Sequence, residues 1–406
     1  MPVGLKAPNN LLPINGVRFS SINAGIYQQK DRDDLALIEL VEGSQAAGVF
    51  TKNVFCAAPV VIAKSHLDIT SPKYLLINAG NANAGTGQQG IKDVIACCET
   101  LSNISQVQIS KIIPFSTGVI GEKLPVKNIQ DKLPELLHGL SDDSVIAVAN
   151  AIKTTDTLAK GISKQIIING ETITITGIAK GSGMIKPDMA TMLSYIFTDA
   201  KLEKDLLQKI LINCTEKSFH RITVDGDTST NDACLLIATG NSTIEVLEKN
   251  ETDYSVFLKA LEEVFIYLAQ SIVRDGEGAT KFVTIRVDNG SSESECSLTG
   301  DKIAHSPFVK TALFASDPNW GRILAAIGRS GIHELDISNV DIYLDDMPII
   351  KQGEVDGNYS EERGKQVMEK DEIMIRINLN RGDNSMDIWT SDLSYEYVKI
   401  NAEYRT

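Results

Sequence analysis

The sequence predicts a mixed α/β (α+β) fold, and three observations lead to this prediction. Short runs of apolar and β-branched residues alternate with segments whose apolar residues recur at helical spacing. The pair Asn169-Gly170 separates two such runs within 165–176, the pattern of a β-hairpin with a type I′ turn. The 406 residues are 43% hydrophobic and 23% charged, which suits one large or two moderate globular domains.

The first half of the chain combines strands, helices and this one hairpin. The run 74–78 reads as a strand and leads into the glycine-rich segment 79–87, after which a helical pattern follows. The segment that begins at Lys180 follows directly after the hairpin. The expected strands are 35–41, 74–78 and 111–121, and the expected helices are 91–101, 126–137 and 142–151.

The second half begins with a buried strand and ends in shorter units. From residue 281 the composition shifts to short αβ units, which indicates a second, smaller domain. We therefore predict a main domain over 1–280, a smaller αβ domain over 281–385 and a tail over 386–406. The tail alternates like a strand up to its last residue, and we expect it to be docked. The other expected elements are the strands 191–197, 233–239, 372–379 and 386–390 and the helices 203–219 and 254–273.

The charge balance and the cysteine usage exclude several classes of protein. A net charge of -14 argues against nucleic-acid and anionic-membrane partners, which require a concentrated basic surface. The six cysteines form no CxxC pair and no Cys/His cluster at zinc spacing. The first residues lack an apolar signal core, and no window approaches the roughly 18 apolar residues of a membrane span. We expect a soluble, reduced, cytoplasmic protein.

Two segments have the layout of ligand-binding motifs but lack the required residues. The segment 79–87 follows a strand and precedes a helix, as phosphate sites do, yet it has no Gly-Lys-Ser/Thr. The acidic segment 221–232 offers oxygen ligands for calcium. However, the EF-hand pattern requires glycine and glutamate where Thr230 and Leu236 stand. We therefore predict neither a metal site nor a nucleotide phosphate site.

Thr191 stands where a flexible loop enters a rigid strand. Gly181 and Gly183 permit unusual backbone conformations, and Pro187 keeps the preceding residue out of a helix. If the bond between Ala190 and Thr191 were cut, the new α-amine, with a pKa of about 7.7–8.0, could act as base for the Thr191 hydroxyl. Thr191 is therefore a candidate nucleophile. A threonine that simply begins a strand is the alternative, and this pattern alone leaves it open.

The strand 111–121 ends in a turn that carries Thr117 and Gly118. A hydroxyl and a backbone N–H in such a turn can point at one position, which is the minimum for an oxyanion hole. Thr-Gly pairs also occur in ordinary turns, so both interpretations remain.

The segment Lys180-Gly-Ser-Gly-Met-Ile-Lys-Pro-Asp-Met-Ala-Thr-Met-Leu193 resembles the processing site of the ornithine acetyltransferases of arginine biosynthesis, also called glutamate N-acetyltransferases. Further matches are scattered from about residue 46 to the end of the chain. The resemblance implies a layered α/β/β/α sandwich core. It also implies self-cleavage between Ala190 and Thr191 into chains 1–190 and 191–406, and a heterotetramer with two copies of each chain.

The same resemblance assigns roles to individual residues. Thr191 becomes the acyl-accepting nucleophile, Thr117 and Gly118 stabilise the tetrahedral intermediate, and the tail returns to the active site. Without the resemblance, Glu277 would be expected to be an exposed loop residue, because it lies between two glycines after a helix. The substrate-binding positions that the resemblance implies are Thr154, Lys180, Thr191, Glu277, Asn401 and Thr406.

The predicted function is transfer of an acetyl group from N-acetylornithine to glutamate, which releases ornithine and N-acetylglutamate. The route is ping-pong, through an acetyl-threonine intermediate. Exchange of one amide for another is close to energy-neutral, so no cofactor is expected, although acetyl-CoA is a possible second donor. The alternatives are an amidohydrolase or aminopeptidase with the same nucleophile, a noncatalytic small-molecule binding protein and, weakest, a phosphotransferase built on the turn 80–85.

Overall fold

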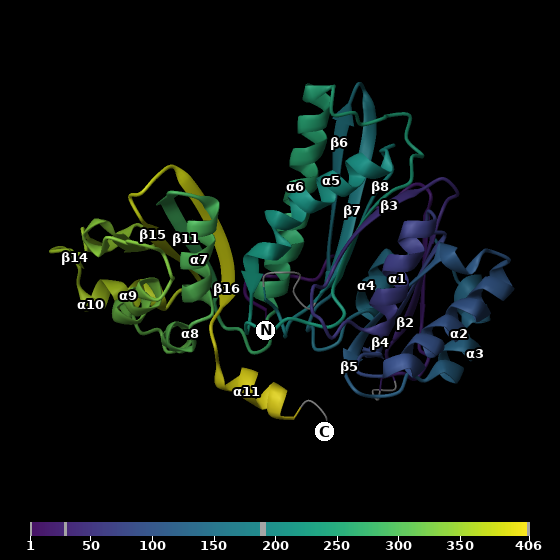
Figure 1. Ribbon diagram of the computed structural model, residues 1–406, viewed down its shortest axis with the longest axis horizontal. Helices are drawn as coiled ribbons and strands as arrows, with labels where there is room; N and C mark the ends of the chain where they lie inside the picture. Colours follow the sequence, from purple (N-terminus) through teal and green to yellow (C-terminus); the bar gives the residue numbers. More distant parts are fainter. Residues whose placement is uncertain (1, 28–30, 187–191, 404–406) are drawn as a thin grey trace.

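The computed structural model describes residues 2–27, 31–186 and 192–403. Figure 1 shows a larger lobe, which contains two β-sheets, and a smaller lobe built on a third.

The two sheets of the larger lobe have the strand orders β1-β2-β4-β5 and β3-β10-β8-β7-β6. Neighbouring strands are antiparallel except for β4 with β5 and β8 with β10, which are parallel. The strands are β1 (Val17–Ile22), β2 (Leu35–Leu40), β3 (Gln45–Phe50), β4 (Tyr74–Asn81), β5 (Ile112–Val119), β6 (Lys160–Ile168), β7 (Glu171–Lys180), β8 (Leu193–Thr198) and β10 (Ala233–Ala238).

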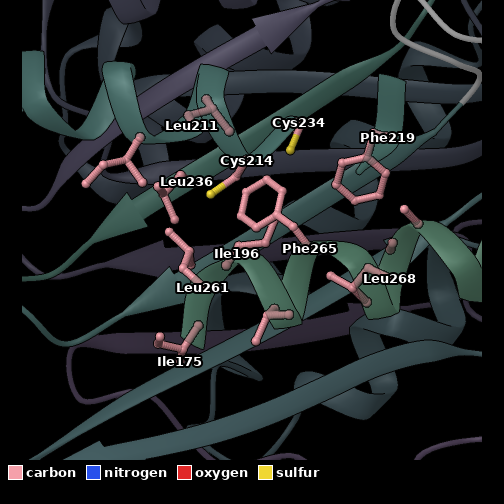
Figure 2. Close-up of a cluster of buried hydrophobic side chains, with 14 of the residues drawn as sticks. Ile175, Ile196, Leu211, Cys214, Phe219, Cys234, Leu236, Leu261, Phe265 and Leu268 are labelled. Atoms are coloured by element: carbon pink, nitrogen blue, oxygen red, sulfur yellow. The ribbon is translucent and has the colours of Figure 1, made fainter. Parts of the chain in front are cut away.

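Alternating side chains of these strands form three apolar layers. Ile38 of β2 and Tyr195 of β8 belong to the core between the sheets, whereas Leu37 packs with α2 and α3 on the outer face of the first sheet. Ile196 packs with α5 and α6 on the outer face of the second sheet, as Figure 2 shows. The layer order is therefore helix, sheet, sheet, helix, and the predicted α/β/β/α core is confirmed. The helices are α1 (Ala58–Ile69), α2 (Gly87–Ser105), α3 (Val126–His138), α4 (Val145–Ala151), α5 (Lys204–Glu216) and α6 (Glu251–Arg274).

The predicted hairpin is formed by β6 and β7. Both central residues of its turn have positive φ, 52° at Asn169 and 82° at Gly170, as a type I′ turn requires. The pairing runs from Ile168 with Glu171 to Lys160 with Ala179. This register places the end of β7, and with it Lys180, beside the loops that enclose the site described below.

The third sheet has the order β14-β13-β12-β15-β11-β16-β9 and carries its own apolar core. β9 lies before the predicted domain boundary at residue 281 yet pairs with β16, and β16 spans the predicted boundary at 386. Both boundaries stay predictions. The elements are β9 (Ile222–Thr223), β11 (Phe282–Gly290), β12 (Asp341–Leu344), β13 (Met347–Lys351), β14 (Glu354–Val355), β15 (Glu372–Asn378), β16 (Asn384–Ser391), α7 (Glu293–Ala304), α8 (Pro307–Phe314), α9 (Trp320–Gly328), α10 (Glu361–Met368) and the short 3₁₀ turns η2 (Phe219–Arg221) and η3 (Ile337–Asn339). A further 3₁₀ turn, η1 (Ile109–Lys111), precedes β5 in the larger lobe.

The prediction that the tail is strand-like holds for 386–390, which belong to β16, but is wrong beyond that strand, because α11 (Tyr395–Ala402) is a helix. The hydroxyl of Ser394 caps it by accepting a hydrogen bond from the Tyr397 N–H. The apparent alternation does not reflect burial, since Tyr395 is 84% and Val398 61% exposed. The tail is nevertheless docked: the Ser394 hydroxyl also donates to the Gly278 carbonyl at 2.6 Å, and α11 lies below the two lobes in Figure 1.

Within the described part of the chain, no helix is long and apolar enough to cross a membrane.

Candidate active site

A cavity of about 270 Å³ lies where the ends of β5 and β7 meet α11 and the loops of Ala82, Thr154, Gly183, Asn231 and Glu277. Its lining includes every predicted site residue that the structure describes. These six are Thr117, Gly118, Thr154, Lys180, Glu277 and Asn401. The other predicted positions, Ala190, Thr191 and Thr406, lie outside the described residues.

Gly118 allows the backbone at the end of strand β5 to lie close to the backbone of β4. Its φ is +133°, and a Cβ at this position would lie 2.2 Å from the carbonyl carbon of Gly80. Only glycine fits such a close approach of two backbones. The β4–β5 register pairs Gly80 with Gly118 and Ala79 with Thr117. Thr117 and the Gly118 amide are thereby held on a rigid sheet edge at the cavity.

Lys180 is the buried cation of the cavity. It is 3% exposed, and its Nζ donates a hydrogen bond to the Thr117 hydroxyl at 3.1 Å. Burial lowers the pKa of Lys180, while the Asp156 carboxylate opposes that shift. The ammonium group therefore sits beside a proposed oxyanion residue, where a carboxylate ligand would gain a strong charge-assisted contact.

Glu277 is a buried carboxylate rather than the exposed loop residue that its glycine neighbours alone suggest. It is 8% exposed, and its Oε2 accepts a hydrogen bond from the Asn401 side-chain amide at 2.8 Å. A Cβ on Gly183 would lie 2.4 Å from the Glu277 carboxyl carbon, so glycine at 183 leaves room for this carboxylate. The contact also ties α11 to the cavity wall.

The cavity thus presents both signs of charge, with the Lys180 ammonium and the Glu277 carboxylate in its lining. Such a pair suits a small ligand that itself carries a carboxylate and an ammonium group. Among the residues that the structure describes, no group of three or more His, Cys, Asp or Glu side chains could hold a metal ion. Hydroxyl, amide, ammonium and carboxylate groups line the described site.

The family model described as ArgJ family matches residues 18–406. The chain belongs to the ArgJ family. The predicted membership in the ornithine acetyltransferases of arginine biosynthesis is confirmed.

Relatives of this ArgJ family member match it along its whole length. The arginine biosynthesis bifunctional protein ArgJ of Pseudomonas fluorescens (strain Pf0-1) is 52% identical over 407 residues, covering 100% of both chains. The protein of the same name from Psychrobacter arcticus is 50% identical over 408 residues, again covering 100% of both. The crystal structure of the protein of that name from Bacillus halodurans is 41% identical, with a TM-score of 0.51. That match covers 53% of this chain and 100% of the other.

Sequence reasoning on this ArgJ family chain missed several residues that shape the site. Asn231 lines the cavity and donates its side-chain amide to the carbonyls of Ala82, at 2.6 Å, and Ser116, at 2.9 Å. Asp232 is 1% exposed and accepts the Met192 N–H at 3.0 Å. Both belong to the acidic segment 221–232 that is considered above for calcium.

Two acidic residues of that segment, Asp225 and Asp232, accept hydrogen bonds from backbone N–H groups. Asp225, considered above as a calcium ligand, accepts the backbone N–H groups of Met184 at 2.6 Å and Ile185 at 2.9 Å. Met184 lines the cavity with φ of 57°, an unusual conformation for a residue other than glycine. Asp225 therefore stabilises the loop that leads from β7 toward the predicted cleavage point.

Proposed function

We propose that this protein transfers the acetyl group of N2-acetyl-L-ornithine to L-glutamate through an acetyl ester on Thr191. The observation that carries the proposal is the placement of Thr117, Gly118, Lys180 and Glu277 around one small cavity. The reaction class follows from the family: the chain is an acyltransferase of arginine biosynthesis.

The first half-reaction begins when the Thr191 hydroxyl oxygen attacks the acetyl carbonyl carbon, while the α-amine created by cleavage after Ala190 takes the hydroxyl proton. The resulting oxyanion accepts hydrogen bonds from the Thr117 hydroxyl and the Gly118 N–H. The Lys180 ammonium, which donates to the Thr117 hydroxyl oxygen, orients that hydroxyl so that its own proton can point at the oxyanion. The carbon–nitrogen bond then breaks, and ornithine leaves after its nitrogen takes up the proton.

The second half-reaction reverses these steps with a new amine. The amino group of glutamate attacks the acetyl-threonine ester and loses a proton to the Thr191 amine. The ester carbon–oxygen bond then breaks, the Thr191 oxygen takes that proton from the amine, and N-acetylglutamate leaves. One amide is exchanged for another. The Lys180 ammonium binds the α-carboxylate that ornithine and glutamate share, and the Glu277 carboxylate binds the side-chain ammonium of ornithine.

Several finer points belong to the same proposal. The two chains 1–190 and 191–406 stay associated and form a heterotetramer with two copies of each, in the cytoplasm. We also propose acetyl-CoA as a second acetyl donor.

The experiment that tests the proposal separates transfer from hydrolysis. Purified protein is incubated with N-acetylornithine, with and without glutamate, and ornithine and N-acetylglutamate are quantified. We expect ornithine release to require glutamate beyond the first turnover and to match N-acetylglutamate formation. Continued release of ornithine and acetate without glutamate would instead assign the protein to the amidohydrolases.

A further inference from the structure

Three loops around the cavity meet at one buried ion cluster, formed by Asp156, Lys160 and Asp275. The Lys160 Nζ lies 2.6 Å from Asp156 Oδ1 and 2.6 Å from Asp275 Oδ2. The side chains of Lys160 and Asp156 are 0% exposed, and that of Asp275 is 1% exposed. Ion pairs shielded from water in this way persist only where hydrogen bonds satisfy the remaining oxygens.

The carboxylate oxygens of Asp156 and Asp275 accept further hydrogen bonds from residues of the cavity loops. Asp156 Oδ1 accepts the Gly181 N–H at 2.6 Å, and its Oδ2 accepts the Thr154 N–H at 3.1 Å. Asp275 Oδ2 accepts the Thr157 N–H at 3.0 Å, and its Oδ1 accepts the Thr157 hydroxyl.

Each of these loops carries a substrate-binding position of the proposed function. Gly181 directly follows Lys180, Thr154 lines the cavity itself, and Asp275 lies two residues before Glu277. One cluster of three side chains therefore fixes the relative positions of all three contacts.

The Asp156 carboxylate of the same cluster also supplies negative charge that favours the protonated form of Lys180. The titratable groups that face Lys180 are Asp156, Lys160, Asp232 and Glu277. Burial lowers the pKa of Lys180, and Asp156 is the strongest influence in the opposite direction. Burial disfavours the ionised form of Asp156, but Lys160 and Lys180 outweigh burial and hold the pKa of Asp156 below its usual range.

We propose that Asp156 is a positioning residue for substrate binding. Through the buried Asp156–Lys160–Asp275 cluster, it aligns the chain segments that carry Thr154, Lys180 and Glu277. Its carboxylate also keeps Lys180 in the cationic form that a substrate carboxylate requires. The inference rests on the proposed function, in which Lys180 binds that carboxylate. Asp156 itself does not line the 270 Å³ cavity, so it acts through its neighbours.

The variant Asp156→Asn tests this role. Asparagine keeps the shape and one acceptor oxygen but removes the charge that faces Lys180. We expect KM for N-acetylornithine and for glutamate to rise roughly tenfold or more, the loss typical of one charge-assisted contact, with a smaller effect on kcat. The alkaline limb of kcat/KM should also move to lower pH, because Lys180 would lose its proton more easily.

Three comparisons distinguish positioning from a general loss of structure. Asp199→Asn is the matched control, since Asp199 also accepts a backbone N–H, that of Thr174 at 2.9 Å, without lining the cavity. Asp275→Asn should raise KM but move the alkaline limb less than Asp156→Asn does, because Asp275 contacts Lys160 and Thr157, whereas Asp156 contacts the Gly181 backbone next to Lys180. It also keeps the proposal testable if Asp156→Asn fails to fold. N-acetylputrescine, the substrate without its carboxylate, does not bind through Lys180, so its KM should rise less on Asp156→Asn than the KM for N-acetylornithine does.

Two results would overturn the inference. One is an Asp156→Asn enzyme that folds and keeps the wild-type KM and alkaline limb. The other, should that variant not fold, is an Asp275→Asn enzyme with the wild-type KM. Wild-type protein that transfers no acetyl group would instead refute the proposed function, so the two failures are distinguishable.

Discussion

Gly183→Ala is the substitution whose effect on the site can be worked out most directly. A Cβ at this position would lie 2.4 Å from the Glu277 carboxyl carbon and 2.5 and 2.6 Å from its oxygens. The obstructing group is the end of a flexible side chain beside a cavity, so it can move away. We therefore expect the free energy of unfolding to fall by no more than about 1–3 kcal/mol, the contribution of the one hydrogen bond that is lost. The displaced carboxylate loses its 2.8 Å bond from Asn401 and its position for the ornithine ammonium.

The kinetic loss follows from that displacement. A hydrogen bond to a charged group contributes about 1.5–3 kcal/mol, so kcat/KM for N-acetylornithine should fall roughly tenfold to a hundredfold. The assay is initial-rate kinetics at saturating glutamate. Gly328→Ala is the control, because a Cβ there has no atom within 4 Å. A Gly183→Ala enzyme with wild-type kcat/KM would refute the reasoning that Glu277 must occupy its observed position.

Three further predictions concern stability. Gly118→Ala should lower the free energy of unfolding by about 2–5 kcal/mol in urea titrations, because the added Cβ clashes with the β4 backbone. Gly121→Ala is the control: Gly121 also has positive φ, but its added Cβ would have no atom within 4 Å, so the loss should be only about 1 kcal/mol. Equal losses for the two variants would contradict the predicted clash. Asp232→Ala should lower the free energy of unfolding by about 1–3 kcal/mol, because the Met192 N–H loses its acceptor. Asp232→Asn should lower it less, because burial raises the pKa of Asp232 and already favours the neutral side chain. Burial lowers the pKa of Lys310 from 10.5 to about 8, so between those pH values this side chain binds more protons in the unfolded chain, and its own contribution to stability should rise with pH relative to a Lys310→Met variant. A Lys310→Met variant with the same pH dependence of stability as the wild type would contradict this assignment.

Local chemistry made much of the fold predictable from the sequence. The Asn169-Gly170 turn appeared as predicted because positive φ at both residues is an intrinsic preference, independent of distant contacts. The strand around Tyr195 could be predicted because it is buried on both faces and therefore reads as one apolar run.

Long-range contacts explain the features of the fold and the site that could not be predicted from the sequence. The tail contains alternating residues, but the cap at Ser394 and its bond to Gly278, 116 positions away, favour the helix α11. The predicted helix 91–101 misses the first turn of α2, Gly87 to Gly90, whose polar residues lack helical apolar spacing. Asp156 and Asp275 lie far apart in the sequence, and only the folded chain shows that Lys160 joins them.

The most direct test of the central claim is intact-mass analysis of the purified protein and its Thr191→Ala variant, before and after addition of N-acetylornithine. The account predicts two fragments for the wild type, 1–190 and 191–406, with the second becoming heavier by one acetyl group on incubation. The variant should remain one unmodified, inactive chain. A wild-type protein that turns over substrate as a single uncut chain, or a processed and active Thr191→Ala variant, would contradict the account.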